Sequence, residues 1–334
     1  MNGDLLDAIA RRELLRRAGL GALALAAGSS ALAQAGDYPR RPIRVVVNNA
    51  AGGGVDVVAR AITQPMSEAI GQPVVIDNRG GAGGLIGGEA VAKADADGYT
   101  LLATAGSMVV IAPHLYRKIA FDPMKDLVPV APAGRATLFL VVRQGIPVQN
   151  VDQFIRHLKA NAGKLSYGSA GNGSSLHLAG EMFKQQAGVD AVHVPYKGAA
   201  PAIQDLLGGQ LDFMFDSGTA LEHVRSGRLR LLAVANMARS SLFPDVPTLD
   251  QSGLKGFDAG STYGFFAPAN TPAEVVNRLN TEINRTMSLK PVRDRLMAIG
   301  AEPTQGTPQQ FAAVLREDSR RFGEIVRERK ITIE

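Results

Sequence analysis

I-R-V-V-V-N-N-A-A-G-G-G-V-D-V-V-A-R-A-I occupies residues 43–62 and decides the fold class. A β-branched run from Ile43 to Val47 is followed by three glycines and then by a run that is typical of a helix. This succession predicts a β-strand, a tight turn and an α-helix. Such a turn presents backbone N–H groups and a helix N-terminus to an anion. The stretch therefore predicts an α/β protein with a turn that is able to bind an anion.

The glycine clusters limit which anion this loop can hold. Gly52-Gly53-Gly54 is not followed by Lys-Ser or Lys-Thr, so the P-loop pattern fails at the residue that would reach the outer phosphates. A second cluster, at residues 80–87, spaces its glycines as G-x-G-x-x-x-G, one residue longer than the dinucleotide fingerprint. Tight turns explain both clusters as well as anion binding does. The motifs therefore give no support to nucleotide binding.

Short apolar runs alternate with longer helical stretches along the rest of the chain. This pattern predicts βαβ units and largely parallel sheets. Strands are expected at residues 43–47, 74–77, 100–104, 138–142, 165–168, 192–195, 213–215, 231–235 and 263–267, and C-terminal helices at 271–290, 292–299 and 308–327. Two seams between clusters of units are expected near residues 131–134 and 251–260, which are rich in turn residues.

Composition excludes several functional classes. Of the 334 residues, 46% are hydrophobic and 20% are charged, which is typical of a globular protein. The formal charge of +5 is modest and the basic residues are scattered, so nucleic acid is not an expected partner. The absence of cysteine excludes disulfides, thiolate metal ligands and a cysteine nucleophile. Beyond residue 35, no stretch approaches the ~20 apolar residues that a membrane span needs.

The first 35 residues resemble an export signal. Arg11-Arg12 leads into an Ala/Leu/Gly-rich run at residues 18–27, and A-Q-A at 33–35 offers small residues for cleavage. The paired arginines predict the twin-arginine route, with an ordinary secretory signal as the alternative. An amphipathic helix is disfavoured because the run has no polar face. We therefore expect a protein outside the cytoplasm whose signal is removed near Ala35.

Catalytic motifs are missing from the sequence. Tyr167-Gly168-Ser169-Ala170-Gly171 is near a nucleophile elbow, but a Tyr stands where G-x-S-x-G needs its first Gly. The five histidines form no H-E-x-x-H pattern. We therefore predict no catalytic residue, no metal site and no cofactor.

One long motif makes a resemblance to a known family specific. Residues 194–216, V-P-Y-K-G-A-A-P-A-I-Q-D-L-L-G-G-Q-L-D-F-M-F-D, resemble the signature of the substrate receptors of tripartite tricarboxylate transporters, the Bug/TctC family. Residues 78–84, 97–102, 169–181 and 266–269 agree with the same family. The similarity covers essentially the whole chain after the signal, in the same order.

The resemblance implies a two-lobed periplasmic-binding-protein fold of the Venus-flytrap kind, type II-like. Each lobe is then α/β, with a mainly parallel sheet flanked by helices. Residues 36–138 and 259–334 would form lobe 1, and residues 139–258 lobe 2. Such receptors hold a small carboxylate between the lobes through backbone amides, hydroxyls and water, and deliver it to membrane permease subunits. The implied protein is a monomeric solute receptor and not an enzyme.

The family's binding loops map onto defined positions of this chain. The implied ligand contacts are Asn49, Ala51, Gly52, Gly53, Asp56 and Ser107 in lobe 1, and Ser169, Ser174, His177, Tyr196, Gly198, Ala199 and Asp216 in lobe 2. A local structural role is an equal alternative for three of them. Asp56 can cap the first helix, Ser174 can be an N-cap, and His177 can be a buried helix residue.

This chain departs from the family pattern where specificity is set. The first loop begins Asn48-Asn49 in place of Pro-Phe or Pro-Tyr, so we expect Asn49 to change ligand choice. Gly80 stands where Pro is common, and Pro65 should kink or interrupt the first helix. Two other functions stay open: a sensing protein that docks on a sensor kinase, and an exported α/β enzyme.

Overall fold

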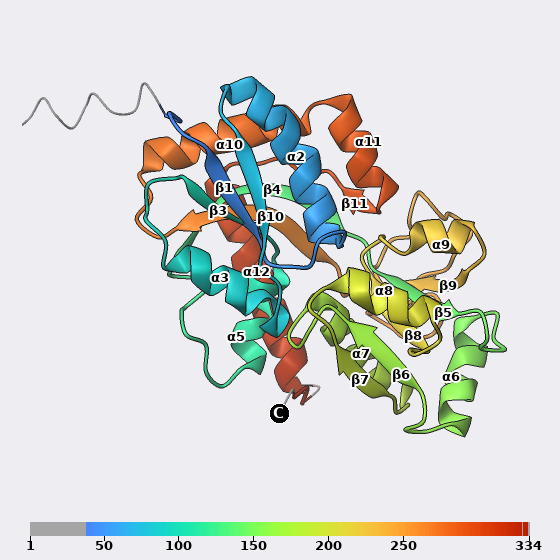
Figure 1. The fold of residues 1–334 in the computed structure, drawn as a ribbon. Helices are drawn as coiled ribbons and strands as arrows, with labels where there is room; N and C mark the ends of the chain where they lie inside the picture. The colour runs from blue at the N-terminus through green and yellow to red at the C-terminus, as the bar shows by residue number, and fades with distance from the viewer. Residues whose placement is uncertain (1–37, 329, 333–334) are drawn as a thin grey trace, which may run out of the picture. The chain divides into compact units, whose positions relative to one another are not determined.

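The computed structural model describes residues 38–328 and 330–332. The predicted export signal at residues 1–35 lies outside these residues. The described residues from 41 onward form one compact unit, which is the unit described below (Figure 1). Within the described part of the chain, no helix combines the length and the apolar character that a membrane crossing requires.

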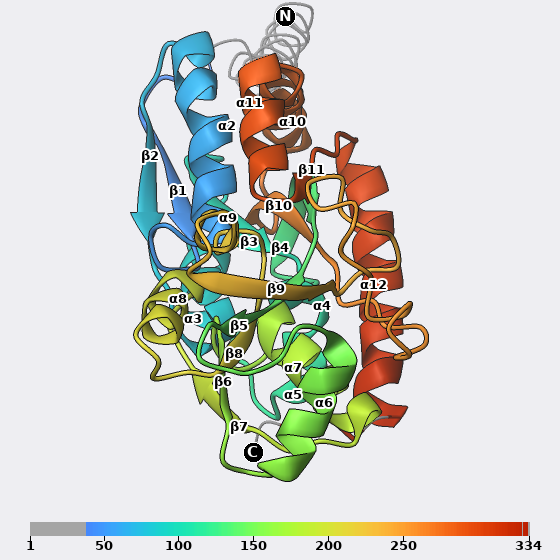
Figure 2. The ribbon, with the colours of Figure 1, turned by 90° about the vertical axis from the view of Figure 1, so that its right-hand side faces the viewer.

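Two sheets organise this unit (Figures 1 and 2). In the described residues, sheet A has the strand order β11-β4-β10-β3-β1-β2, with β1 (Ile43–Val47), β2 (Val74–Asn78), β3 (Thr100–Ala105), β4 (Leu127–Ala136), β10 (Ser261–Pro268) and β11 (Ala301–Glu302). Sheet B has the order β7-β6-β8-β5-β9, with β5 (Phe139–Arg143), β6 (Ser166–Ser169), β7 (Val192–Pro195), β8 (Phe213–Asp216) and β9 (Leu229–Val234). We call each sheet with its helices a lobe, sheet A belonging to lobe 1.

Helices accompany both sheets, and the predicted α/β class is confirmed. Lobe 1 contains α2 (Gly54–Ile70), η1 (Ala82–Gly84), α3 (Leu85–Ala92), α4 (Ser107–Val110), α5 (Ala112–Leu115), α10 (Ala273–Met287), α11 (Lys290–Ala298) and α12 (Pro308–Glu328). Lobe 2 contains α6 (Val151–Ala160), α7 (Ser175–Ala187), α8 (Ala199–Leu207) and α9 (Leu221–Arg225). Helix α2 packs against α10 and α11, whereas α12 packs on β4 and α4. The residue limits predicted for the lobes stay a prediction.

Both sheets mix parallel and antiparallel strands because the chain passes between them twice. β4 ends where the chain leaves sheet A and β10 begins where it returns, so these two neighbours run antiparallel. β5 begins where the chain enters sheet B, and β9 ends where the chain leaves it. These two neighbours are therefore antiparallel as well. β1 pairs in parallel with β2 and β3, and β6 with β7 and β8. The largely parallel sheets expected from the alternation are therefore mixed.

The sequence pattern does not predict β4, and it assigns residues 131–134 to a seam. In the structure these residues lie inside the strand, and the pairing register with β10 shifts at two places. Pro129 and Pro132 lie next to these shifts. Proline is tolerated at bulges, where the ladder does not need its missing N–H. Pro65 likewise does not interrupt α2, which continues to Ile70 with Ile62 and Met66 buried on either side of the proline.

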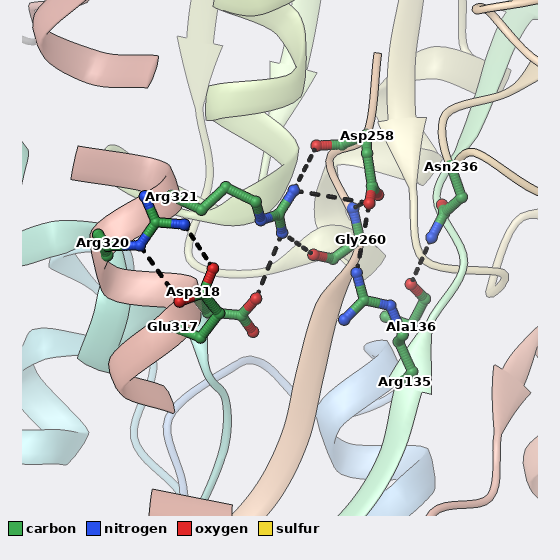
Figure 3. A network of polar contacts seen from close by, with 9 residues as sticks. All are labelled: Arg135, Ala136, Asn236, Asp258, Gly260, Glu317, Asp318, Arg320 and Arg321. Atoms are coloured by element: carbon green, nitrogen blue, oxygen red, sulfur yellow. Dashed lines mark hydrogen bonds and ion pairs between the residues drawn. The ribbon is translucent and has the colours of Figure 1, made fainter. Parts of the chain in front are cut away.

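A polar network holds the two connecting segments together (Figure 3). Arg321 on α12 donates to the Asp258 carbonyl at 3.1 Å, and Arg135 on β4 pairs with the Asp258 carboxylate at 3.4 Å. The Asn236 amide bonds the backbone of the other segment, residues 136–138, through both its oxygen and its nitrogen. Helix α12 is thereby tied to the returning segment, which in turn bonds β4 and the outgoing segment.

Candidate functional site

A cavity of about 30 Å³ lies between residues of the two lobes. Its polar lining in lobe 1 consists of Asn48, Asn49, Thr104, Ser107 and Tyr263. Lobe 2 supplies Ser174, Ser175 and Ser217. Among the described residues that line the cavity, none carries a charged side chain.

Strand ends place most of these side chains. Asn48 directly follows β1, Ser107 follows β3 after one residue, and Ser217 directly follows β8. The carboxyl ends of parallel strands meet at one edge of a sheet, which is where open α/β sheets bind ligands. Tyr263 reaches the same edge from the opposite direction, because β10 is antiparallel to β3 and Tyr263 pairs with Ala105.

Three helices of nine or more residues begin at the cavity. Gly54 and Val55 open α2, Ser175 and Leu176 open α7, and Ala199 opens α8, and all of these residues line the cavity. The first N–H groups of a helix have no acceptor inside the helix, and the helix dipole places partial positive charge there. Two of these helix starts come from lobe 2 and one from lobe 1. The site can therefore attract an anion without Lys or Arg.

The lobes touch each other around the cavity. Ala50 N donates to the Lys197 carbonyl at 3.0 Å, and the Tyr263 and Ser217 side chains share a hydrogen bond. The contact between Ala50 and Lys197 requires glycine nearby, because a Cβ on Gly80 would lie 2.4 Å from the Lys197 oxygen. A Cβ on Gly198 would lie 2.8 Å from Ala50 N. The departure from Pro at residue 80 therefore lies at a contact between the lobes.

The structure brings four of the predicted site residues to the cavity: Asn49, Ser107, Ser174 and Ala199. Ala51 and Gly52 are exposed on the first loop, and Gly53 is buried as the N-cap of α2. These three residues are not part of the cavity lining among the described residues.

Asp56 lies outside the cavity lining and bonds the first loop. Its carboxylate accepts hydrogen bonds from Gly52 N, Arg60 Nε and Asn78 Nδ2, each at 2.9 Å. Burial acts to raise the pKa of Asp56, but these bonds outweigh it and hold that pKa below its usual value. Asp56 therefore shapes the loop as an ionised group.

Ser174 and His177 shape the loop before α7. The Ser174 hydroxyl caps the helix by accepting from His177 N at 3.2 Å. The His177 ring is buried, its Nδ1 accepts from Gly173 N at 3.2 Å, and it stacks on His193 with 4.1 Å between ring centroids. Burial, followed by the positive charge of Lys184, lowers the pKa of His177 to about 4. His177 is therefore neutral at pH 7.

Buried Ser169 forms a Ser–His pair with His193. Its Oγ lies 2.7 Å from His193 Nε2, and the residue is 0% exposed. Burial, with a further contribution from His177, lowers the pKa of His193 to about 3. Ser169 Oγ also accepts from Gly171 N at 3.1 Å. The pair thus holds the loop in place and does not line the cavity.

The other predicted residues of lobe 2, apart from Ala199, do not line the cavity among the described residues. The Tyr196 hydroxyl donates to Asp205, and Gly198 is the N-cap residue of α8. Asp216 accepts from Gly218 N at 2.6 Å and from Ala220 N at 2.8 Å. Complete burial raises the pKa of Asp216 against the opposing effect of these bonds.

Sequence reasoning missed the cavity roles of Asn48, Thr104, Ser175, Ser217 and Tyr263. Asn48 and Ser217 each directly follow a strand, so the strand-end rule could have found them. Tyr263 lies near the start of its strand, where no local signal marks it. Its position depends on the antiparallel pairing of β10 with β3.

Comparisons with known proteins identify the family of the chain. The family model for the tripartite tricarboxylate transporter family receptor matches residues 58–331. Protein BugT of Bordetella pertussis is 37% identical over 311 residues, 92% of this chain and 95% of that protein.

Solved structures of the same kind superpose closely. The periplasmic binding protein BugD gives a TM-score of 0.85 at 34% identity, covering 88% of this chain and 99% of that one. Rpa4515 of R. palustris with adipate gives 0.85 at 33%, over 88% and 99% of the two chains. MatC from Rhodopseudomonas palustris with bound malate gives 0.83 at 34%, over 86% and 100%.

The fold is thus that of the two-lobed periplasmic binding proteins. The chain belongs to the tripartite tricarboxylate transporter receptor family, whose members are solute-binding receptors and not enzymes.

Proposed function

We propose that this protein is a periplasmic receptor that holds a small carboxylate in the cavity between its lobes and delivers it to a tripartite tricarboxylate-type permease. The observation that carries the proposal is the meeting of three helix starts, α2, α7 and α8, at a cavity lined by hydroxyl and amide groups. A carboxylate is stabilised by such backbone N–H groups and helix dipoles. The adipate and malate of two related structures support the same ligand class.

The proposal divides the predicted site residues into two groups. Asn49, Ser107, Ser174 and Ala199 contact the ligand, through side chains or through the N–H of a helix start. The second group holds the loops in position: Ala51, Gly52, Gly53, Asp56, Ser169, His177, Tyr196, Gly198 and Asp216. Contact by Asn49 stays an expectation from its place in the cavity lining.

Thermal unfolding with a panel of mono-, di- and tricarboxylates tests the ligand class. A ligand at 100 times its Kd stabilises the folded state by ~2.7 kcal/mol, which raises Tm by several degrees. Calorimetry should then show one site per chain, and the ligand should be recovered unchanged. Absence of any shift in folded protein, or formation of a product, would contradict the proposal.

Export and delivery need separate measurements. N-terminal sequencing of protein from a periplasmic fraction should begin near residue 36, and replacement of Arg11 and Arg12 by Lys distinguishes the two export routes. Membrane vesicles that contain a tripartite permease should take up labelled carboxylate only when the receptor is added. Uptake that ignores the receptor would contradict delivery while leaving ligand binding intact.

A further inference from the structure

One polar side chain of the cavity has a group that the fold does not use. Asn48 is 2% exposed and lines the cavity. Its side chain lies against the second glycine cluster, since a Cβ on Gly84 would lie 2.2 Å from Asn48 Nδ2. A Cβ on Gly87 would lie 2.8 Å from Asn48 Cβ. The glycines that fail as a dinucleotide motif therefore make room for this side chain.

The hydrogen bonds determine which way the Asn48 amide points. Nδ2 donates to Thr104 Oγ1 at 2.7 Å and to the Gly84 carbonyl at 3.3 Å. The Gly84 carbonyl can only accept, and the Thr104 hydroxyl gives its own proton to the Ala105 carbonyl at 2.7 Å. A flipped amide would face two acceptors with its oxygen. The NH2 group must therefore lie on the Thr104 side.

This orientation leaves Asn48 Oδ1 buried, and no described residue donates a hydrogen bond to it. Buried polar atoms in native proteins are nearly always paired, so an exception needs an explanation. Asn48 lines the cavity, but Oδ1 itself has less than 1 Å² of accessible surface, so a ligand that widens the cavity as it binds can supply the missing donor. The same atom would penalise a ligand without a donor, since it would stay buried and unsatisfied.

We propose that Asn48 Oδ1 accepts a hydrogen bond from a hydroxyl group of the ligand, so that this receptor selects hydroxycarboxylates over unsubstituted carboxylates of equal length. This inference rests on the proposed carboxylate-binding function. A hydroxyl fits better than an ammonium group because the described lining has no carboxylate to balance a buried positive charge. Adjacent Ser107 and Ser174 hydroxyls can both donate and accept, so they do not impose this choice.

Matched ligand pairs that differ by one hydroxyl test the inference by calorimetry. The pairs are glycolate and acetate, lactate and propionate, malate and succinate, and citrate and tricarballylate. For each pair that binds, the hydroxylated member should bind about tenfold more tightly. Equal affinity within every pair overturns the inference, including the case in which water satisfies Oδ1. Failure of every carboxylate to bind overturns the proposed function instead.

Two variants assign the selectivity to this atom. Asn48→Leu keeps the approximate shape but removes the acceptor, so the ratio within a pair should fall to about one. Ser107→Ala removes another polar group of the same cavity and should weaken both members in parallel, which leaves the ratio near ten. A ratio that persists in Asn48→Leu overturns the inference. If Asn48→Leu does not fold, judged by circular dichroism, the ratio in the unchanged protein decides alone.

Aspartate provides the control for charge, because it offers an ammonium group in place of the malate hydroxyl. It should bind more weakly than malate in the unchanged protein. Aspartate binding tighter than malate would overturn the choice of a hydroxyl.

Discussion

The loop of lobe 1 at residues 48–53 and the loop of lobe 2 at residues 170–174 both carry a helix start to the cavity, but different chemistry holds them. The first is organised around an ionised carboxylate, Asp56, which accepts three hydrogen bonds. The second is organised around neutral groups, a serine cap and the stacked rings of His177 and His193. The pKa is lowered in both cases, by hydrogen bonds to the charged form of Asp56 and by burial of the histidines.

The two loops both position a helix start at the cavity, but their stabilities respond differently to pH. Lowering the pKa of an acid keeps it charged, so the first loop keeps its bonds well below neutral pH. Lowering the pKa of a base keeps it neutral, so the second loop resists protonation and loses stability in acid. Acidification should therefore loosen the cavity from the side of lobe 2 first.

The largest effect is expected from Asp56→Ala. The change leaves Gly52 N and Asn78 Nδ2 without their buried acceptor, which should lower the free energy of unfolding by about 2–4 kcal/mol. Urea unfolding measures this loss, and calorimetry should show weaker carboxylate binding. Asp152→Ala is a matched control, since Asp152 also pairs at i,i+4 in a first helical turn but is 73% exposed. The Asp152→Ala variant should lose less than ~1 kcal/mol of unfolding free energy. Equal losses in the two variants would contradict a special role for Asp56.

The second effect concerns pH and His177. Its folded pKa of about 4 lies below the ordinary value of 6.5, so the unfolded chain binds more protons between these values. The contribution of neutral His177 to the free energy of unfolding is complete above pH 6.5 and is lost as pH falls toward 4. The loss amounts to about 2 kcal/mol at pH 5. Asp56 contributes almost no change between pH 5 and pH 8, because its ordinary pKa of 3.8 and its lower folded pKa both lie below this range.

Unfolding between pH 5 and pH 8 measures this dependence. His177→Gln should flatten the profile by the stated amount, while the buried His193 retains its own part of the slope. Lys184, whose positive charge lowers the pKa of both rings, must stay unchanged in this comparison. An unchanged slope in His177→Gln would show that its neutral form does not stabilise the second loop.

The smallest effect is expected from Ser174→Ala. Loss of the α7 cap should lower the free energy of unfolding by about 1 kcal/mol. Asn150→Ala removes an equivalent cap, because Asn150 Oδ1 accepts from Gln153 N at 2.9 Å at the start of α6. Both variants should lose similar stability, but only Ser174→Ala should weaken carboxylate binding, since Ser174 lines the cavity. Equal affinities of the two variants would limit Ser174 to a cap.

Local sequence patterns predicted most strands well because their apolar runs are continuous. The run at residues 43–47 coincides with β1, and that at 192–195 coincides with β7. β4 escaped prediction since its two prolines oppose a strand locally, and only pairing with β10 through two bulges makes the strand possible. The interruption of α2 expected at Pro65 does not occur, because packing of the buried face outweighs one missing hydrogen bond.

The site shows more clearly which features are encoded locally in the sequence and which depend on tertiary contacts. The sequence by itself determined the α/β class, the family and the loops that meet at the cavity, because glycine turns and strand ends are local features. The pairing of Asp56 with Asn78, 22 positions away, and the stacking of His177 on His193 depend on the folded arrangement of the chain. The tertiary structure also decided that Asn48 and Tyr263 line the cavity together with Asn49. Strand register and contact between the lobes set these partners, and no short stretch of sequence encodes either of them.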